Sequence, residues 1–170
     1  MNSKILQWNM RSFRSQKPSL QAAIETIKPS IIALQETNLK PKLRSYLSSY
    51  HFPPVRKDRI GRDGGGVALF IHHSLQYNVI QLDTPLEVVA ALIFFDRTPI
   101  TIVSMYIPPD YLLSDLHTNL ENLIDQLSSP FLIAVDKNAN HPSWGSTIAN
   151  ARGNFIGHLI DKRSLIINSK

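Results

Sequence analysis

The sequence predicts an α/β fold in which several strands end in polar side chains. Two short apolar runs, 31–34 and 131–135, are bounded by turn-forming residues, as buried strands are. The first run passes directly into Gln35-Glu36-Thr37, and the second passes into Asp136-Lys137-Asn138. In open α/β sheets, functional groups gather beyond the carboxyl ends of the strands. We therefore expect one site assembled from strands that are far apart in the sequence.

The chain is predicted to begin with a strand–helix–strand unit, which is consistent with parallel pairing of the two strands. The first strand covers residues 4–9 and the second covers 31–35. Pro18 suits the first turn of the helix between them. Lys28-Pro29 ends that helix, whose apolar face consists of Ala22, Ala23, Ile24 and Ile27.

The middle of the chain is predicted to contain a short helix, a long surface loop and a β meander. The helix covers 41–49, and the loop covers 51–66, where Pro, Arg and Gly are frequent. Strands rich in Val, Ile and Phe follow at 66–71, 76–82, 87–95 and 100–106. A tight turn at 96–99 joins the last two strands, and Pro108-Pro109-Asp110 ends the meander.

The last part of the chain is predicted to form a helix, a strand and a second helix. Ser114 offers an N-cap to the first helix. Its core-facing residues recur at helical spacing and are Leu116, Leu120, Leu123, Ile124 and Leu127. Residues 128–130 break this helix before the strand that ends at Asp136. A final helix over 154–162 and the start of a strand over 165–168 complete the prediction.

The composition is that of one globular domain over residues 1–170. Hydrophobic residues make up 43% of the 170 positions, and there is no cysteine for a disulfide or a thiolate metal site. No segment approaches the roughly 18 uninterrupted apolar residues of a membrane span. Polar residues from Lys4 to Arg11 interrupt any apolar core of a signal peptide. We therefore expect no membrane partner.

The net charge of +5 is unevenly distributed. Residues 1–63 contain twelve Lys or Arg against four acids, a balance of +8, whereas residues 64–170 contain six against nine, a balance of −3. Such asymmetry indicates either a basic face that meets a polyanion or an ordinary solubilising surface. Charge alone does not separate these two interpretations.

The polar residues at the strand ends could hold a phosphate group and a divalent cation. Side chains alternate along a strand, so Asp136 and Asn138 should share one face, where they could orient a water molecule and a phosphate oxygen. Glu36 could supply a hard oxygen ligand to Mg²⁺, which usually takes one or two protein carboxylates and completes its shell with water and phosphate. Asn9 and Tyr106, at the ends of the first and sixth predicted strands, could donate hydrogen bonds to the same phosphate.

Each of these residues also has an ordinary structural interpretation. Glu36 could start a helix, and Asn9 could form a turn. Tyr106 could be a core residue whose hydroxyl reaches solvent. His141, which precedes Pro142, could be a simple loop residue. The functional interpretation depends on these residues falling at strand ends together.

Five motifs in the chain occur in an order that resembles the endonuclease/exonuclease/phosphatase superfamily. They are Gln7-Trp8-Asn9-Met10-Arg11-Ser12, Leu34-Gln35-Glu36-Thr37, Gly64-Gly65-Gly66-Val67-Ala68, Tyr106-Ile107-Pro108-Pro109, and the stretch from Asp136 to Ser146. The His-Pro-x-Trp-Gly-Ser end of the last motif, followed by Asn150-Ala151-Arg152-Gly153, is most similar to the apurinic-type endonuclease domain of jockey-like non-LTR retrotransposons. The resemblance covers essentially the whole chain.

The resemblance implies a four-layer α/β sandwich with two mixed sheets packed face to face beneath outer helices. It implies Mg²⁺ or Mn²⁺ as cofactor and DNA as substrate. The implied metal site is Glu36, Asn9 and Asp136, and the implied substrate contacts are Asn9, Asn138, Tyr106 and His141. Asp136 would orient the attacking water, Tyr106 would hydrogen-bond the scissile phosphate, and Asn138 would help hold it.

The implied reaction nicks one DNA strand and leaves a 3′-hydroxyl that primes reverse transcription. The resemblance also implies a reverse transcriptase domain in the full-length polyprotein. It further implies that the protein is intracellular and acts on DNA in the nucleus.

Two departures from the family pattern bear on activity. Lys137 stands where the family usually has an aromatic residue, on the face expected to turn away from the metal, where an unpaired ammonium would be costly unless it reaches solvent. The family's terminal Ser-Asp-His motif is absent, because Ser114-Asp115 is followed by Leu116. We therefore expect the sandwich to lack its last strands and the chain alone to be inactive or barely active.

Other classes of protein are less consistent with the sequence. Gly64 to Gly66 are followed by a predicted strand and no Gly-Lys-Ser/Thr, so they are not a nucleotide-binding loop but more plausibly open a hairpin near the site. His72-His73 lack partners at a zinc-site spacing, and no Gly-x-Ser-x-Gly is present. A phosphoinositide phosphatase or sphingomyelinase of the same fold, or a non-catalytic relic of a decayed element, remains an alternative. Target sequence and oligomeric state are not readable from the chain.

Overall fold

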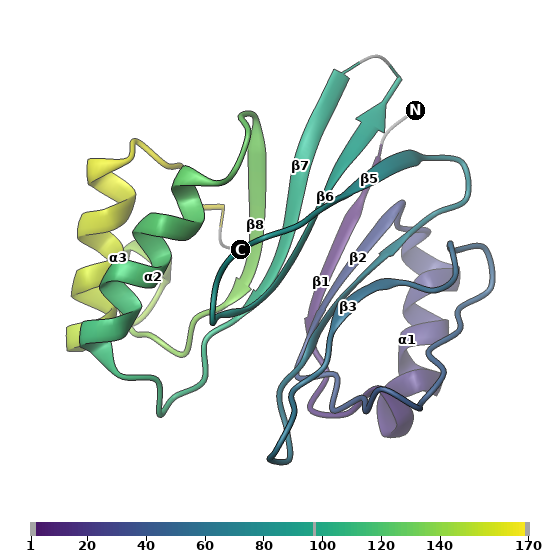
Figure 1. The fold of residues 1–170 in the computed structure, drawn as a ribbon, viewed down its shortest axis with the longest axis horizontal. Helices are drawn as coiled ribbons and strands as arrows, with labels where there is room; N and C mark the ends of the chain where they lie inside the picture. Colours follow the sequence, from purple (N-terminus) through teal and green to yellow (C-terminus); the bar gives the residue numbers. More distant parts are fainter. Residues whose placement is uncertain (1–2, 97, 169–170) are drawn as a thin grey trace.

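Two four-stranded sheets lie face to face in the computed structural model, which describes residues 3–96 and 98–168 (Figure 1). The strand orders are β1-β2-β4-β3 and β5-β6-β7-β8. In each sheet one outer pair is parallel, β1 with β2 and β7 with β8, and the other pairs are antiparallel. Helix α1 covers the outer face of the first sheet, and α2 and α3 cover that of the second. The predicted four-layer sandwich with two mixed sheets is confirmed.

The elements follow the predicted order with three differences: strand β3 is additional, and the helix predicted over 41–49 and the strand predicted over 165–168 do not form. The first sheet contains β1 (Ile5–Asn9), β2 (Ile31–Gln35), β3 (Val55–Lys57) and β4 (Val67–Ile71). The second contains β5 (Gln76–Ile80), β6 (Glu87–Phe95), β7 (Thr98–Tyr106) and β8 (Phe131–Asp136). The helices are α1 (Phe13–Ile27), α2 (Leu113–Asp125) and α3 (Ala151–Lys162), and a 3₁₀ turn, η1, covers Pro142–Trp144. No helix in the described residues combines the length and apolar content needed to cross a bilayer.

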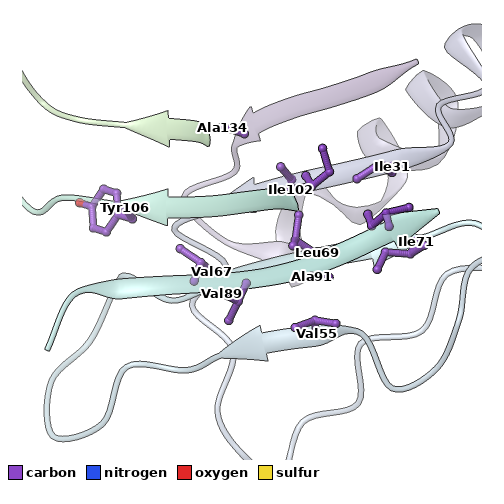
Figure 2. Packing of buried hydrophobic residues seen from close by; sticks show 12 residues of the cluster. Ile31, Val55, Val67, Leu69, Ile71, Val89, Ala91, Ile102, Tyr106 and Ala134 are labelled. Carbon is purple, nitrogen blue, oxygen red and sulfur yellow. The ribbon is translucent and has the colours of Figure 1, made fainter. Parts of the chain in front are cut away.

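The central strands of the first sheet, β2 and β4, are buried on both faces because this sheet is covered on both sides. On β2, Ile31 and Ala33 face the second sheet, whereas Ile32 and Leu34 face the layer that contains α1. Figure 2 shows the central layer, in which side chains such as Leu69 and Ile102 from the two sheets pack against each other. Tyr106 belongs to the same layer and lies at its end, where β7 stops. The core therefore continues directly into the region where the strands end.

Two predictions about the first half of the chain were wrong in their details. Helix α1 starts at Phe13 and not near Pro18, because the Ser12 side chain caps it and the Phe13 ring stacks on Phe70 at 5.7 Å. The Pro-, Arg- and Gly-rich segment predicted to be a loop contains β3, which pairs with β4. Tyr106 therefore ends the seventh strand and not the sixth.

The helix predicted over 41–49 is absent; the structure has an irregular extended segment there. Arg56 explains the difference, because its guanidinium donates hydrogen bonds to the carbonyls of Lys40, Pro41 and Leu43 and to the Ser45 hydroxyl. These hydrogen bonds come from a residue outside the segment, so the helix propensity of residues 41–49 could not predict them.

The second half of the chain departs from prediction at its helix ends. Helix α2 starts at Leu113, with Leu112 in the N-cap position and no side-chain cap, so Ser114 is not the cap. Helix α3 starts three residues earlier than predicted because Asn150 accepts a hydrogen bond from the Gly153 amide. Residues 165–168 are not a strand. In the predicted 96–99 turn, β7 already begins at Thr98, and Arg97 lies outside the described residues.

Tyr50 makes the first sheet sensitive to alkaline pH. Its ring is 2% exposed, its hydroxyl donates to the Pro29 carbonyl at 2.6 Å, and burial raises its pKa to about 12. The unfolded pKa is about 10, so the buried neutral form stabilises the fold below pH 10, and this stability is lost as pH rises from 10 to 12. We expect Tyr50 to account for about 2.5 kcal/mol of that loss. Urea unfolding at pH 8, 10 and 12 should therefore show a smaller decline for Tyr50→Phe; an identical decline in both proteins would contradict this expectation.

Candidate active site

Side chains from the ends of three strands meet at one point of the sandwich. Asn9 ends β1, Glu36 follows β2, and Asp136 ends β8. The Asn9 amide nitrogen donates to Glu36 Oε1 at 2.7 Å and also to Asp136 Oδ2. The two carboxylates, which belong to different sheets, are thus bridged by one amide group. The structure brings these three predicted residues together.

Left-handed backbone conformations concentrate around these strand ends. Four of the non-glycine residues with positive φ are Arg11 (53°), Glu36 (50°), Asn38 (49°) and Asn138 (45°). Residues held in this sparsely populated region cost about 1–3 kcal/mol each and cluster at functional sites. Here they turn the chain sharply just after β1, β2 and β8. The Arg11 turn is closed by its amide, which donates to Asn9 Oδ1 at 3.1 Å.

The predicted common face for Asp136 and Asn138 was wrong, because β8 stops at Asp136 and does not continue as a strand. Asn138 turns back, so that its amide donates to Asp136 Oδ1 at 3.2 Å. Its side chain donates to the Ile107 carbonyl at 3.0 Å. Asn138 thus connects the loop after β8 to the loop after β7, one residue beyond Tyr106.

Tyr106 is placed opposite Asp136 by the register of β7 and β8. It is 6% exposed, and its pKa is raised to about 12. Burial is the main cause; the negative charge of Glu36, a hydrogen bond to Glu36 and the charge of Asp136 add to it, whereas Arg59 acts in the opposite direction. The hydroxyl therefore keeps its proton at neutral pH and is a hydrogen-bond donor beside Glu36.

Arg59 and Glu87 form an ion pair behind Tyr106, which the sequence did not predict. Arg59 Nε donates to Glu87 Oε1 at 2.6 Å, and the guanidinium lies 5.6 Å from the centre of the Tyr106 ring. Glu87 Oε2 accepts the Gly66 amide at 2.7 Å, and a side chain on Gly65 would overlap the Arg59 guanidinium. The glycine turn does approach the site, as predicted. Arg59, which contacts this turn, was not predicted as a site residue, because it lies in a segment that was predicted to be a surface loop.

A buried glutamine joins the two sheets beneath the carboxylates. Gln35 is 0% exposed, and its amide nitrogen donates to Ser104 Oγ at 3.0 Å and to the Ala134 carbonyl at 3.3 Å. Ser104 in turn donates to the Leu34 carbonyl at 3.0 Å. These bonds hold β2 against β7 and β8, so that Glu36 and Asp136 stand together. The signal in the sequence was a single polar residue inside an apolar strand.

Removing this link should destabilise the fold. Gln35→Ala leaves the Ala134 carbonyl and the Ser104 hydroxyl without that donor in the core, which we expect to cost about 2 kcal/mol. Gln126→Ala is the matched control, because Gln126 is exposed and donates to the Asp83 carbonyl (3.0 Å) away from the two sheets' contact, where water can replace it. Guanidinium unfolding of the three proteins measures the difference, and equal midpoints for the two variants would show that the buried link contributes nothing.

In the loop after β8, Lys137 and His141 both pack against the Trp144 ring. Lys137 Nζ lies 4.5 Å from the centre of the Trp144 ring, so the ammonium contacts an aromatic face as a cation–π pair. Burial lowers the pKa of Lys137, and the charge of Asp136 opposes that shift. His141 stacks on the same ring system at 4.9 Å, and its Nδ1 accepts the Ser143 amide. The structure gives His141 this capping role; it does not place it in the cluster around Asn9.

The donor set fits a hydrated hard cation better than a closed transition-metal site. Within residues 3–96 and 98–168, no group of three or more His, Cys, Asp or Glu is placed to hold a metal. The two carboxylates of Glu36 and Asp136 match the small number of protein ligands that Mg²⁺ usually takes. Asn9, the third predicted ligand, presents its side-chain nitrogen to these carboxylates and its oxygen to the Arg11 amide.

A sequence model described as the Endonuclease/Exonuclease/phosphatase family matches residues 6–163. The chain belongs to this family. The family predicted from the five motifs is therefore confirmed.

The endonuclease/exonuclease/phosphatase family members most informative for this chain come from mobile elements. The probable RNA-directed DNA polymerase from transposon X-element of Drosophila melanogaster is 25% identical over 169 residues, which cover 94% of this chain and 18% of that protein. The chain thus spans under a fifth of the length of this relative.

Solved structures show the same family fold. The endonuclease domain of TRAS1, a telomere-specific non-LTR retrotransposon, superposes with a TM-score of 0.83 at 21% identity, covering 99% of this chain and 74% of that one. The AP endonuclease LMAP from Leishmania major superposes with a TM-score of 0.68 at 15% identity, covering 94% and 66%. Both likenesses show that the chain has the fold of these solved structures.

Proposed function

We propose that the chain is a metal-dependent DNA endonuclease domain that nicks one strand and leaves a 3′-hydroxyl for reverse transcription. The observation that carries the proposal is the pair of carboxylates, Glu36 and Asp136, that Asn9 bridges beside the Tyr106 hydroxyl. Two carboxylates and a protonated phenol at the end of a sandwich form a site for a phosphodiester. The transposon-encoded relatives and the basic first half of the chain favour DNA.

Each residue has a chemical task in this proposal. Glu36 and Asp136 would hold Mg²⁺ or Mn²⁺, which when bound offsets the charge that develops on the phosphorus and the departing oxygen. Tyr106 donates its proton in a hydrogen bond to a phosphate oxygen. Asp136 orients the attacking water. Asn138 holds the loops after β7 and β8 together, so that the phosphate meets both at a fixed separation.

We expect the chain alone to be slow. The Ser-Asp-His motif is absent from the sequence, and a missing general acid or base typically costs about 10²–10⁴-fold in rate. The Drosophila relative is a polymerase of which this chain matches 18%. We therefore propose that the domain works beside a reverse transcriptase domain in a longer polyprotein, in the nucleus, where chromosomal DNA is available.

Calorimetric titration with Mn²⁺ and Mg²⁺ tests the metal site without requiring activity. We expect binding to the wild-type chain, loss of binding in Glu36→Gln, and unchanged binding in Glu25→Gln, an exposed acid on α1. Absence of binding to the wild type would overturn the proposal and indicate a decayed site.

Supercoiled plasmid incubated with Mg²⁺ then tests the reaction. Weak nicking that disappears in Glu36→Gln agrees with the proposal. Robust nicking that disappears in the same variant would retain the endonuclease assignment and refute the expected low rate.

A further inference from the structure

The connection between β2 and β3 presents alternate side chains to solvent over residues 43–48. Leu43 packs against the α1 side of the first sheet, and Ser45 and Leu47 are buried. Arg44 and Tyr46, which alternate with them, are exposed, as are Lys42 before this stretch and Phe52 after it. These four exposed side chains form a row on a buried base.

Arg56 holds this row in place from below. Its four hydrogen bonds reach the carbonyls of Lys40, Pro41 and Leu43 and the hydroxyl of Ser45, at 2.9–3.3 Å. The guanidinium also pairs with Asp58 at 3.2 Å. The row is thus organised before any partner arrives, which lowers the entropy lost on binding.

Two aromatic rings stand exposed at the end of the row. Tyr46 is 54% exposed and Phe52 is 52% exposed, and their ring centres are 6.1 Å apart in an edge-to-face arrangement. The other exposed large hydrophobic residues in the described chain are aliphatic. An exposed aromatic pair of this kind has no role in the core of the protein, whereas rings with free faces are surfaces on which nucleic acid bases stack.

The row is positively charged and contains no acid. Residues 38–54 include Lys40, Lys42 and Arg44, without any Asp or Glu. Lys40 pairs with Asp63, but among the described residues Lys42 and Arg44 form no salt bridge. Exposed cations next to exposed rings complement a ligand that has both phosphates and unpaired bases.

The row also leads away from the candidate active site. Lys40 lies at the site end, where it contacts Asp63 and the Arg62 carbonyl on the turn that follows Arg59. Phe52 lies at the opposite end, since its neighbour His51 donates to the Ile71 carbonyl at the last residue of β4. Figure 1 shows this connection passing beside α1 along the outer side of the first sheet.

We propose that Lys42, Arg44, Tyr46 and Phe52 bind a single-stranded nucleic acid. The two cations contact successive phosphates, and the two rings stack on bases. A duplex keeps its bases stacked on each other, so the rings favour a single strand. This binding needs no divalent cation and no catalysis, and therefore goes beyond the proposed function.

Fluorescence anisotropy with short labelled dT and rU oligonucleotides tests the proposal. Each ring that stacks on a base should contribute about 5- to 150-fold in affinity, so we expect Tyr46→Ala/Phe52→Ala to bind at least tenfold more weakly. Tyr46→Phe, which keeps the ring, should bind like the wild type. Ile148→Ala, which removes an exposed aliphatic side chain elsewhere, is the matched control.

Salt dependence tests the cations separately. A contact to one phosphate of a single strand contributes about −0.7 to the slope of log affinity against log salt, so Lys42→Ser/Arg44→Ser should make the slope less steep by about 1.4. Lys28→Asn, which removes an exposed charge at the far end of α1, should leave the slope unchanged.

The outcomes separate this proposal from the proposed endonuclease. Wild-type affinity for both oligonucleotides in Tyr46→Ala/Phe52→Ala would overturn the single-strand surface while leaving metal binding and nicking untouched. Glu36→Gln should bind the oligonucleotides normally, because the row does not include Glu36. Equal loss of binding in Glu36→Gln would assign the binding to the candidate active site instead. Preference for dT over rU, or the reverse, identifies the strand as DNA or RNA.

Discussion

Gly153→Ala should destabilise the protein by about 4 kcal/mol and detach the loop that carries Asn138, although alanine favours helices. A methyl group on Gly153, in the first turn of α3, would overlap the backbone carbonyl of Asn140. That carbonyl accepts the Asn150 amide at 3.1 Å, and Asn150 also caps the helix, so the loop has no freedom to retreat. Overpacking usually costs about 1–3 kcal/mol, and a clash with backbone lies above that range.

Gly157→Ala provides the matched control, because it lies one turn later in the same helix. Its added methyl would meet only the His141 side chain, at 3.2 Å from Nε2. Replacing a helical glycine by alanine gains up to about 1 kcal/mol, so Gly157→Ala should be neutral or slightly stabilising. Guanidinium unfolding compares the two variants, and Trp144 fluorescence reports whether the loop has moved. Equal stability of Gly153→Ala and Gly157→Ala would refute this account of the loop.

Asn9→Ala should cost about 3 kcal/mol at neutral pH. The change removes two hydrogen bonds to charged acceptors, each worth about 1.5–3 kcal/mol, and leaves the Glu36 and Asp136 carboxylates facing each other without a donor between them. Their repulsion should be relieved by a divalent cation. The loss of stability should therefore shrink in the presence of Mg²⁺.

Thermal unfolding at pH 7, with and without Mg²⁺, measures this effect. Asn119→Ala is a suitable control, since Asn119 donates one hydrogen bond to the neutral Tyr111 hydroxyl at 2.9 Å, away from any carboxylate pair. It should lose less stability and show no response to Mg²⁺. An Asn9→Ala variant whose stability does not depend on Mg²⁺ would mean that the two carboxylates do not share a cation.

Local patterns predicted the elements whose stability comes from their own apolar periodicity. The β2 and β8 runs and the strand from Glu87 to Phe95 were predicted within one residue, because each is an apolar run between turn signals. The helices were predicted with wrong starts. Helices α1 and α3 begin at the caps Ser12 and Asn150, upstream of the predicted starts, whereas α2 begins at Leu113 without a side-chain cap. The segment 41–49 was predicted as a helix, whereas the structure has none there, because Arg56 binds the carbonyls of Pro41 and Leu43 and that of the preceding Lys40.

The sequence by itself identified the groups at the strand ends, because apolar runs and turn signals are local properties. It indicated the sandwich and the family through the resemblance of five ordered motifs. Only the tertiary structure decided how those groups meet. The Asn9 bridge, the Gln35 link between sheets, the Arg59–Glu87 pair behind Tyr106 and the exposed Tyr46–Phe52 row each join residues whose contact depends on how two layers pack. The physical reason is that a hydrogen bond or ring contact depends on distances of a few ångströms in space. Spacing along the chain does not specify those distances until the core has closed.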